Sequence, residues 1–204
     1  MFGKYDIKAT FNINSGFLGN KHELVFDGKT VNHSEVDKDE LNSIYQGHEI
    51  AVHTLTHKNL TTINEDEIIY QVETDRKNLE QITGNEIVGM AYPCGGINNN
   101  DFTAEVLKNK TKIKYSRTIT SSYSFDIENN LYRFNPTLHQ SDKRLFEIAQ
   151  KFINLNPEGL KIFYIWGHSY ELDVNEGWKK IEDFLKFISG KEDIFYGTNK
   201  EILL

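Results

Sequence analysis

The chain of 204 residues contains one cysteine, Cys94, and no apolar run long enough to span a membrane. A single cysteine excludes an internal disulfide and a zinc knuckle built on cysteine ligands. The first residues, MFGKYDIKATF, lack the apolar stretch of a secretory signal peptide. As given, the sequence therefore predicts a cytoplasmic chain without a membrane span. A secreted or cell-surface location follows if an N-terminal signal precedes Met1.

The chain also lacks a stripe of lysine and arginine interleaved with aromatic residues. Its 23 basic residues are outnumbered by 30 acidic ones, which gives a net charge of −7. Nucleic acid is therefore not an expected partner. No internal repeat, low-complexity segment or shift in composition divides the sequence. With 38% hydrophobic residues, including 13 Phe and 10 Tyr, residues 1–204 are expected to form one domain with a substantial core.

Short β-rich segments alternate along the chain with segments of helical periodicity. Strands are predicted over residues 7–14, 48–53, 86–93, 112–117, 161–168 and 193–198. A polar loop with a short hairpin and a short helix are expected between the first two strands. Later helices are predicted from their caps, which are Asn64 with Glu67, Asn100, Ser141, and Asp173 with Glu176, and from their stops, Gly84 and Gly190. The alternation indicates an α/β fold with a largely parallel sheet.

Three groups of polar or aromatic residues follow the ends of predicted strands. They are His53 with His57, the segment Tyr92-Pro93-Cys94-Gly95, and Trp166-Gly167-His168. In parallel α/β folds the working groups collect at the carboxyl ends of the strands. We therefore expect these three groups to lie at one edge of the sheet.

His53 and His57 are separated by three residues at the end of a strand. In an extended chain, residues 53, 55 and 57 point to one side, so the two imidazoles could share one cation. Imidazole suits zinc and similar divalent metals. The alternative is a pair of ordinary histidines at the edge of the core, because an HxxxH spacing alone is a weak signal.

His168 follows a strongly apolar strand. Its ordinary pKa near 6.5 suits a general acid or base, although a hydrogen-bonded core histidine would fit the same pattern. Glu171 lies three residues further on, where it either orients His168 or is a solvated loop residue. Asp173 is expected to cap a helix rather than to serve a site.

The remaining polar candidates carry weaker signals. Cys94 is expected to be a small buried thiol, since no feature predicts a lowered pKa. Arg133 and His139 flank an Asn-Pro-Thr loop and are candidates for substrate contact. His22 and His48 are expected to be structural or exposed to solvent.

Taken in order, several motifs resemble the polysaccharide deacetylase family with the NodB-type domain, carbohydrate esterase family 4. The segment GHEIAVHTLTH resembles the family's GHEIGNHTxxH motif, and IKATFNINSGFLG resembles its KATFF segment. MAYPCG is similar to FxxPYG, IFYIWGHSYEL to the late strand that ends in a catalytic histidine, and GTNKEI to ATNxEI. The resemblance extends over nearly the whole chain.

The resemblance implies a distorted (β/α) barrel that removes acetyl groups from N- or O-acetylated carbohydrate with one divalent metal, most often zinc. His53 and His57 would be metal ligands, and His168 would be the general acid. Backbone groups near Tyr92, Pro93, Cys94 and Gly95, together with Trp166, would contact the substrate or its oxyanion. The metal would polarise the acetyl carbonyl and lower the pKa of a water.

Two departures from the family pattern qualify this expectation. Many members have an arginine where this chain has Ala91. The family's TFDDG-type motif, which supplies the general base and a third metal ligand, would precede Ile7, and only six residues stand there. We therefore expect a barrel that is incomplete at its first strand and helix, with the gap covered by upstream sequence, by a partner chain or dimer, or by a rearranged terminus.

Three functional hypotheses remain open from the sequence. The first is a metal-dependent deacetylase whose upstream segment completes the site. The second is a catalytically impaired or inactive member that acts as a binding protein or is a truncated product. The third keeps the site but hydrolyses a non-sugar amide.

Overall fold

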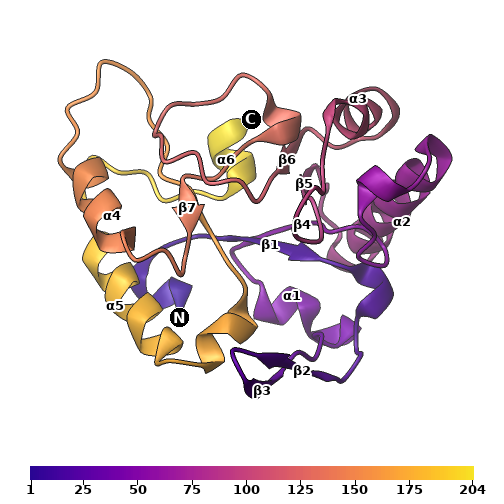
Figure 1. Cartoon of the computed structure of the whole chain (residues 1–204), viewed down its shortest axis with the longest axis horizontal. Coiled ribbons are helices and arrows are strands. Elements are labelled where there is room, and N and C mark those ends of the chain that lie inside the picture. The colour runs from indigo at the N-terminus through magenta and orange to yellow at the C-terminus, as the bar shows by residue number, and fades with distance from the viewer.

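The computed structural model describes residues 1–204. Two pairs of helices flank the strands, with α2 and α3 on one side of the molecule and α4 and α5 on the other (Figure 1). The strands are β1 (Thr10–Ile13), β2 (Glu23–Phe26), β3 (Lys29–Asn32), β4 (Glu49–Val52), β5 (Gly89–Ala91), β6 (Tyr115–Arg117), β7 (Leu138–His139) and β8 (Ile165–Trp166). The α-helices are α1 (Leu41–Ile44), α2 (Glu65–Thr83), α3 (Asp101–Lys110), α4 (Leu145–Ile153), α5 (Gly177–Ile188) and α6 (Asn199–Leu203). The 3-10 helices are η1 (Phe2–Tyr5), η2 (Ser15–Phe17), η3 (Lys38–Glu40), η4 (Leu60–Thr62), η5 (Leu131–Arg133) and η6 (Ser169–Asp173).

Six parallel strands follow one another around an arc. β1, β4, β5 and β6 form a parallel sheet in that order, and β7 pairs in parallel with β8. A parallel bridge between Arg117 and Phe134 connects β6 to the segment that leads into β7. The chain is therefore an α/β protein of the distorted-barrel type, as predicted. β1 lies at one end of the arc and has a strand neighbour only on the β4 side.

A polar network occupies the interior of the arc at the amino ends of the strands. The carboxylate of Glu49 accepts hydrogen bonds from the hydroxyl of Thr10 at 2.8 Å, the hydroxyl of Tyr115 at 2.7 Å and the backbone N–H of Lys200 at 2.9 Å. Asn199, at the start of α6, donates to Tyr164 at 2.7 Å. The C-terminal helix therefore packs across this end and ties β1 to the segment before β8.

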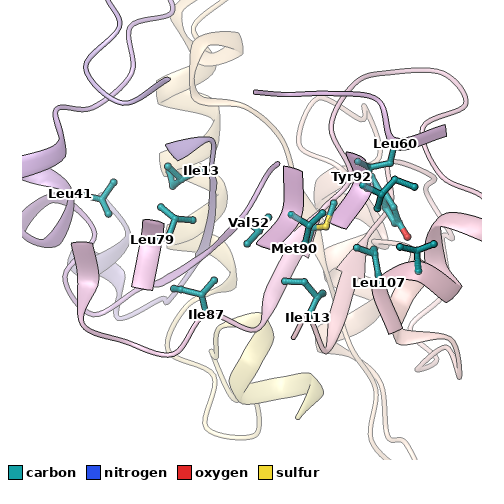
Figure 2. Close-up of a cluster of buried hydrophobic side chains, with 13 residues drawn as sticks. Ile13, Leu41, Val52, Leu60, Leu79, Ile87, Met90, Tyr92, Leu107 and Ile113 are labelled. Carbon is teal, nitrogen blue, oxygen red and sulfur yellow. The ribbon is translucent and has the colours of Figure 1, made fainter. Parts of the chain in front are cut away.

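The main core lies between the outer face of the sheet and the helices α2 and α3. Ile13, Val52 and Met90 point outward from β1, β4 and β5 and meet Leu79 of α2 and Leu107 of α3 (Figure 2). A second cluster joins α4 and α5 to β7 through Leu138, Ile148, Ile181, Phe184 and Ile188. Because alternate strand residues face opposite sides, this packing turns His53, Ala91 and Arg117 inward. No helix combines the length and apolarity that crossing a bilayer requires.

Local cap signals predicted some elements correctly and failed at others. Asn64 accepts a hydrogen bond from the N–H of Glu67, Asn100 forms a capping box with Thr103, and Gly84 ends α2 in a left-handed conformation. Ser141 caps nothing, because α4 begins at Leu145 after a turn. Asp173 lies inside η6 and accepts a hydrogen bond from the indole N–H of Trp178 at 2.7 Å. Residues 193–198 form no strand.

Asp75 on α2 links the core to the loops at the carboxyl ends of β1 and β4. Its buried carboxylate accepts hydrogen bonds from the backbone N–H groups of Ser15 at 2.6 Å and His53 at 3.1 Å. Burial raises its pKa from 3.8 to about 6, although these hydrogen bonds act in the opposite direction. The folded chain therefore holds a proton on Asp75 at a pH where the unfolded chain has released it.

This raised pKa predicts a specific pH dependence of stability. The stability that protonated Asp75 contributes is complete below pH 3.8 and is lost as the pH rises through about 6. Relative to the natural chain, the unfolding free energy of Asp75→Asn should rise by about 2.4 kcal/mol from pH 4 to pH 7. Urea unfolding of both proteins across this range measures it, and parallel curves would show that Asp75 keeps an ordinary pKa.

Candidate functional site

The carboxyl ends of the six parallel strands bring the three predicted groups to one edge of the arc. Residues that pair in register point to the same side of a sheet. Ala91 pairs with Arg117, and Met90 pairs with Val52, so His53, Ala91 and Arg117 lie in one inward-facing layer. His139 pairs with Trp166 on the other side of the arc. Histidines from β4, β7 and β8 therefore surround one end of the barrel.

His53 directly follows β4 and is held in one orientation. Its Nδ1 lies 2.8 Å from the carbonyl oxygen of Ala91. Since a carbonyl oxygen only accepts, Nδ1 carries the proton, which leaves the lone pair of Nε2 free for a metal. Burial lowers the pKa of His53 to about 3, and the charges of His57, Arg117 and His168 act in the same direction. His53 is therefore a neutral imidazole.

The ring of His57 lies beside that of His53, but the backbone between them is not the extended one that the sequence predicted. The chain is not extended from His53 to His57, because Thr54 and His57 both adopt left-handed conformations with φ of 64° and 55°. The expectation that residues 53, 55 and 57 simply point to one side was therefore wrong. The two rings nevertheless converge, with centroids 4.9 Å apart. Burial lowers the pKa of His57, and so does the charge of His168.

The segment after β5 is shaped by a buried amide. The Nδ2 group of Asn98 donates to the carbonyl oxygens of Pro93 at 3.1 Å and Cys94 at 2.8 Å. The backbone N–H of Tyr92 donates to Arg117 at 3.0 Å, and its ring lies in the core. Tyr92 and Pro93 thus have no N–H for an oxyanion, whereas the N–H groups of Cys94 and Gly95 donate to no protein group.

Cys94 lies beside the histidine pair but has the properties of a structural thiol. Its Sγ is 3.5 Å from the carbonyl oxygen of His57 and 3.9 Å from its Nδ1. Burial raises the pKa of the thiol, so the reactive thiolate is disfavoured. The sequence predicted a small buried thiol, whereas Cys94 is only partly buried.

His168 belongs to a second group at the opposite side of the same edge. Its Nδ1 is 2.8 Å from one carboxylate oxygen of Glu171, and His139 Nε2 is 3.3 Å from the other. Burial acts to raise the pKa of Glu171, but hydrogen bonds from His139, His168 and Gln140 outweigh it and hold that pKa well below its usual value. Glu171 is therefore an ordered carboxylate with 13% of its side chain exposed, and not a solvated loop residue.

A buried cation lies between the two groups. The Arg117 guanidinium is 4.4 Å from the centre of the Trp166 ring and donates only to the carbonyl oxygen of Thr118, at 3.0 Å. It makes no ion pair, although it is 6% exposed, and the indole N–H of Trp166 also has no hydrogen-bond partner. Arg144 offers a contrast, because it stacks on Tyr123 at 4.2 Å and is paired with Asp142. The resulting positive potential disfavours a second cation close to His53.

The β2–β3 hairpin covers part of this edge. His33 packs on Tyr170 with ring centres 5.0 Å apart, and Tyr170 stacks on His168 at 5.0 Å. His22 is hydrogen-bonded to His33, with their ring nitrogens 2.6 Å apart. His48 lies at the other end of the sheet, where its Nδ1 accepts the N–H of Ala9 at 3.2 Å. His22 and His48 therefore have the structural roles expected of them.

Arg133 and His139 lie at different places in the structure. Arg133 donates to Asn99 at 2.8 Å and pairs with Asp101 beside α3, whereas His139 joins Glu171 and His168. The sequence suggested substrate contact for both, and no periodicity or motif distinguishes them. Register between β7 and β8 decides the position of His139, and a single sequence does not specify that register.

The histidine pair meets only part of the requirement for a catalytic metal. Catalytic zinc sites have three protein ligands and an open position. His53 and His57 present two neutral imidazoles, and no aspartate, glutamate, cysteine or histidine completes a group of three with them. The pair therefore fits two of the three ligand positions.

These observations define an α/β barrel protein with a histidine-rich site at the carboxyl ends of its strands. The family model for polysaccharide deacetylase matches residues 1–113, and the chain belongs to that family. No curated protein matches the chain. The resemblance inferred from its motifs is therefore confirmed.

Solved structures of related proteins have the same fold at low sequence identity. The deacetylase PplD of Streptococcus pyogenes, determined with acetate, is 22% identical with a TM-score of 0.52, over 65% of this chain and 53% of that one. A CE4 family pseudoenzyme of Bacillus anthracis is 16% identical with a TM-score of 0.53, over 100% of this chain and 58% of the other. A mutant of it with restored enzymatic activity is 17% identical with a TM-score of 0.54, over 100% and 60%. The chain thus spans little more than half the length of these proteins.

Proposed function

We propose that this chain carries the histidine half of a site that removes acetyl groups from acetylated carbohydrate. In that reaction the oxygen of water bonds to the acetyl carbon and the C–N or C–O bond breaks. Acetate leaves, and the amine or alkoxide takes up a proton. The single observation that carries the proposal is the convergence of the His53 and His57 rings, whose centres are 4.9 Å apart, at the edge of the arc where His168 follows β8.

In this proposal, different residues of the chain bind the metal, donate the proton and contact the substrate. His53 and His57 hold a divalent ion, taken to be zinc, which when bound polarises the acetyl carbonyl and supplies a water of lowered pKa. His168, oriented through Nδ1 by Glu171, presents Nε2 to the leaving group as general acid. The free N–H groups of Cys94 and Gly95 are available to the developing oxyanion, and Trp166 contacts the sugar.

A zinc-dependence assay tests this proposal. The chain is stripped of metal with a chelator, zinc is added back, and acetate release from acetylated chitin oligomers and from peptidoglycan is measured. Zinc should restore the release, and His53→Ala and His57→Ala should lower it by at least about tenfold, because ligand loss weakens metal binding. His48→Ala is the matched control. The proposal would be refuted if the rate of acetate release did not depend on zinc, or if it stayed unchanged in both variants.

A second candidate is carbohydrate binding without turnover. It is favoured by the absence of a third ligand beside His53 and His57, since two neutral imidazoles leave the charge of a divalent ion uncompensated. Isothermal titration calorimetry measures the binding of chitin oligomers to the chain. Binding without zinc, and without release of acetate, would select this candidate. Acetate release from a non-sugar amide but from no carbohydrate would select the third hypothesis.

A further inference from the structure

A group of three metal-ligating side chains lies apart from the histidine pair. One ligating atom from each of His139, His168 and Glu171 lies within 4.8 Å of the other two. The three residues come from the end of β7, the residue that caps η6, and η6 itself. Tertiary structure therefore brings them together, and the group is the only one of its kind in the described chain.

The spacing of the three donors approaches that of a tetrahedral ion. Zinc binds nitrogen and oxygen at about 2.0–2.1 Å, so two ligands of one ion stand about 3.3–3.4 Å apart. His139 Nε2 is 3.3 Å from Glu171, whereas His168 Nδ1 is 2.8 Å away, at hydrogen-bond distance. The two distances run to different oxygens of the carboxylate, so binding requires the two rings to turn toward one ion; the side chain of His168 is 40% exposed.

Neighbouring residues hold two of the donors in place. Gln140 donates to the carboxylate of Glu171 at 2.9 Å and to the carbonyl oxygen of His168 at 2.8 Å. The hydroxyl of Ser141 is 2.7 Å from His139 Nδ1. The backbone N–H of Ser141 donates to the same nitrogen at 3.2 Å, so Nε2 carries the proton that faces Glu171, and an ion bound at Nε2 would replace that proton. Outer hydrogen bonds of this kind orient imidazole and carboxylate ligands in metal sites.

The group of His139, His168 and Glu171 differs from the pair of His53 and His57 in the charge of its ligands. Glu171 supplies a negative charge that offsets part of the charge of a divalent ion, whereas His53 and His57 supply none. The unpaired, buried Arg117 lies in the same inward layer as His53 and would oppose an ion beside it. Two imidazoles with one carboxylate form a ligand set that zinc sites use, with a fourth position open to water.

We propose that His139 Nε2, His168 Nδ1 and Glu171 form a binding site for zinc or a similar divalent transition metal, and that this site is the tighter one in the chain. It prefers borderline metals to magnesium or calcium, because imidazole nitrogen is a poor ligand for those harder ions. The site shares His168 and Glu171 with the deacetylase proposal: an ion on His168 Nδ1 would replace its hydrogen bond to Glu171 and would leave Nε2 facing outward.

Zinc titration by calorimetry tests the assignment. The first equivalent should bind equally well to the natural chain and to the double variant His53→Ala/His57→Ala. His139→Ala and Glu171→Gln should weaken that equivalent by about 10–100-fold. The proposal is overturned if the double variant loses the first equivalent while His139→Ala and Glu171→Gln keep it, or if the natural chain binds no zinc.

A measurement on the natural chain avoids dependence on how the variants fold. Nitrogen-15 NMR of the histidine rings reports which nitrogen meets the metal. The first equivalent of zinc should shift His139 Nε2 and His168 Nδ1, and magnesium at the same concentration should shift neither. First shifts at the ring nitrogens of His53 and His57 would assign the tighter site to the pair and overturn the proposal.

Discussion

Replacing His168 with alanine is expected to slow acetate release by about 10²–10⁴-fold, the usual contribution of a positioned general acid. The loss should appear in kcat and equally in kcat/KM, with KM unchanged, because proton donation to the leaving group stabilises the transition state alone. Steady-state kinetics at saturating zinc measure all three.

Two further variants separate the acid from the metal effects. Glu171→Gln keeps the His168 ring and a hydrogen-bond acceptor but removes the carboxylate charge, so its rate loss should be smaller than that of His168→Ala. His48→Ala removes an imidazole at the opposite end of the sheet and should leave kcat unchanged. A His168→Ala rate within threefold of the natural chain would show that His168 is not the acid.

Gly89→Ala is expected to destabilise the fold by about 2–6 kcal/mol. A Cβ at this position would lie 2.0 Å from the hydroxyl oxygen of Tyr115 and 2.3 Å from its Cζ. Tyr115 is fully buried, and its hydroxyl donates to Glu49 at 2.7 Å, so the ring has no free space to move into. Overpacking costs about 1–3 kcal/mol, and loss of the buried hydrogen bond adds about 1–3 kcal/mol. Urea unfolding measures the sum.

Gly159→Ala is the matched control for this substitution. A Cβ at Gly159 would have no atom within 4 Å, so the unfolding free energy should change by no more than about 0.5 kcal/mol. If Gly89→Ala were as mild as Gly159→Ala, Tyr115 would not pack over β5 and the register of β5 with β6 would be wrong.

Much of the fold was predictable because its signals are local. The caps at Asn64 and Asn100 and the stop at Gly84 depend on hydrogen bonds and backbone conformation within a few residues. Ser141 carries the same type of signal as Asn100, yet it hydrogen-bonds His139 instead of starting a helix. Residues 193–198 have strand composition but pair with no strand. Strand composition alone does not specify pairing, since a strand needs a partner.

By itself, the sequence determined the α/β class, the family and the candidate pair His53 and His57, because apolar periodicity and motif spacing are properties of adjacent residues. Only the tertiary structure decided that His139 and Glu171 flank His168, and that Arg117 occupies the layer of His53 and Ala91. These contacts cross strands whose register depends on the packing of the whole core. The same packing leaves the pair without a carboxylate and gives one to His139 and His168.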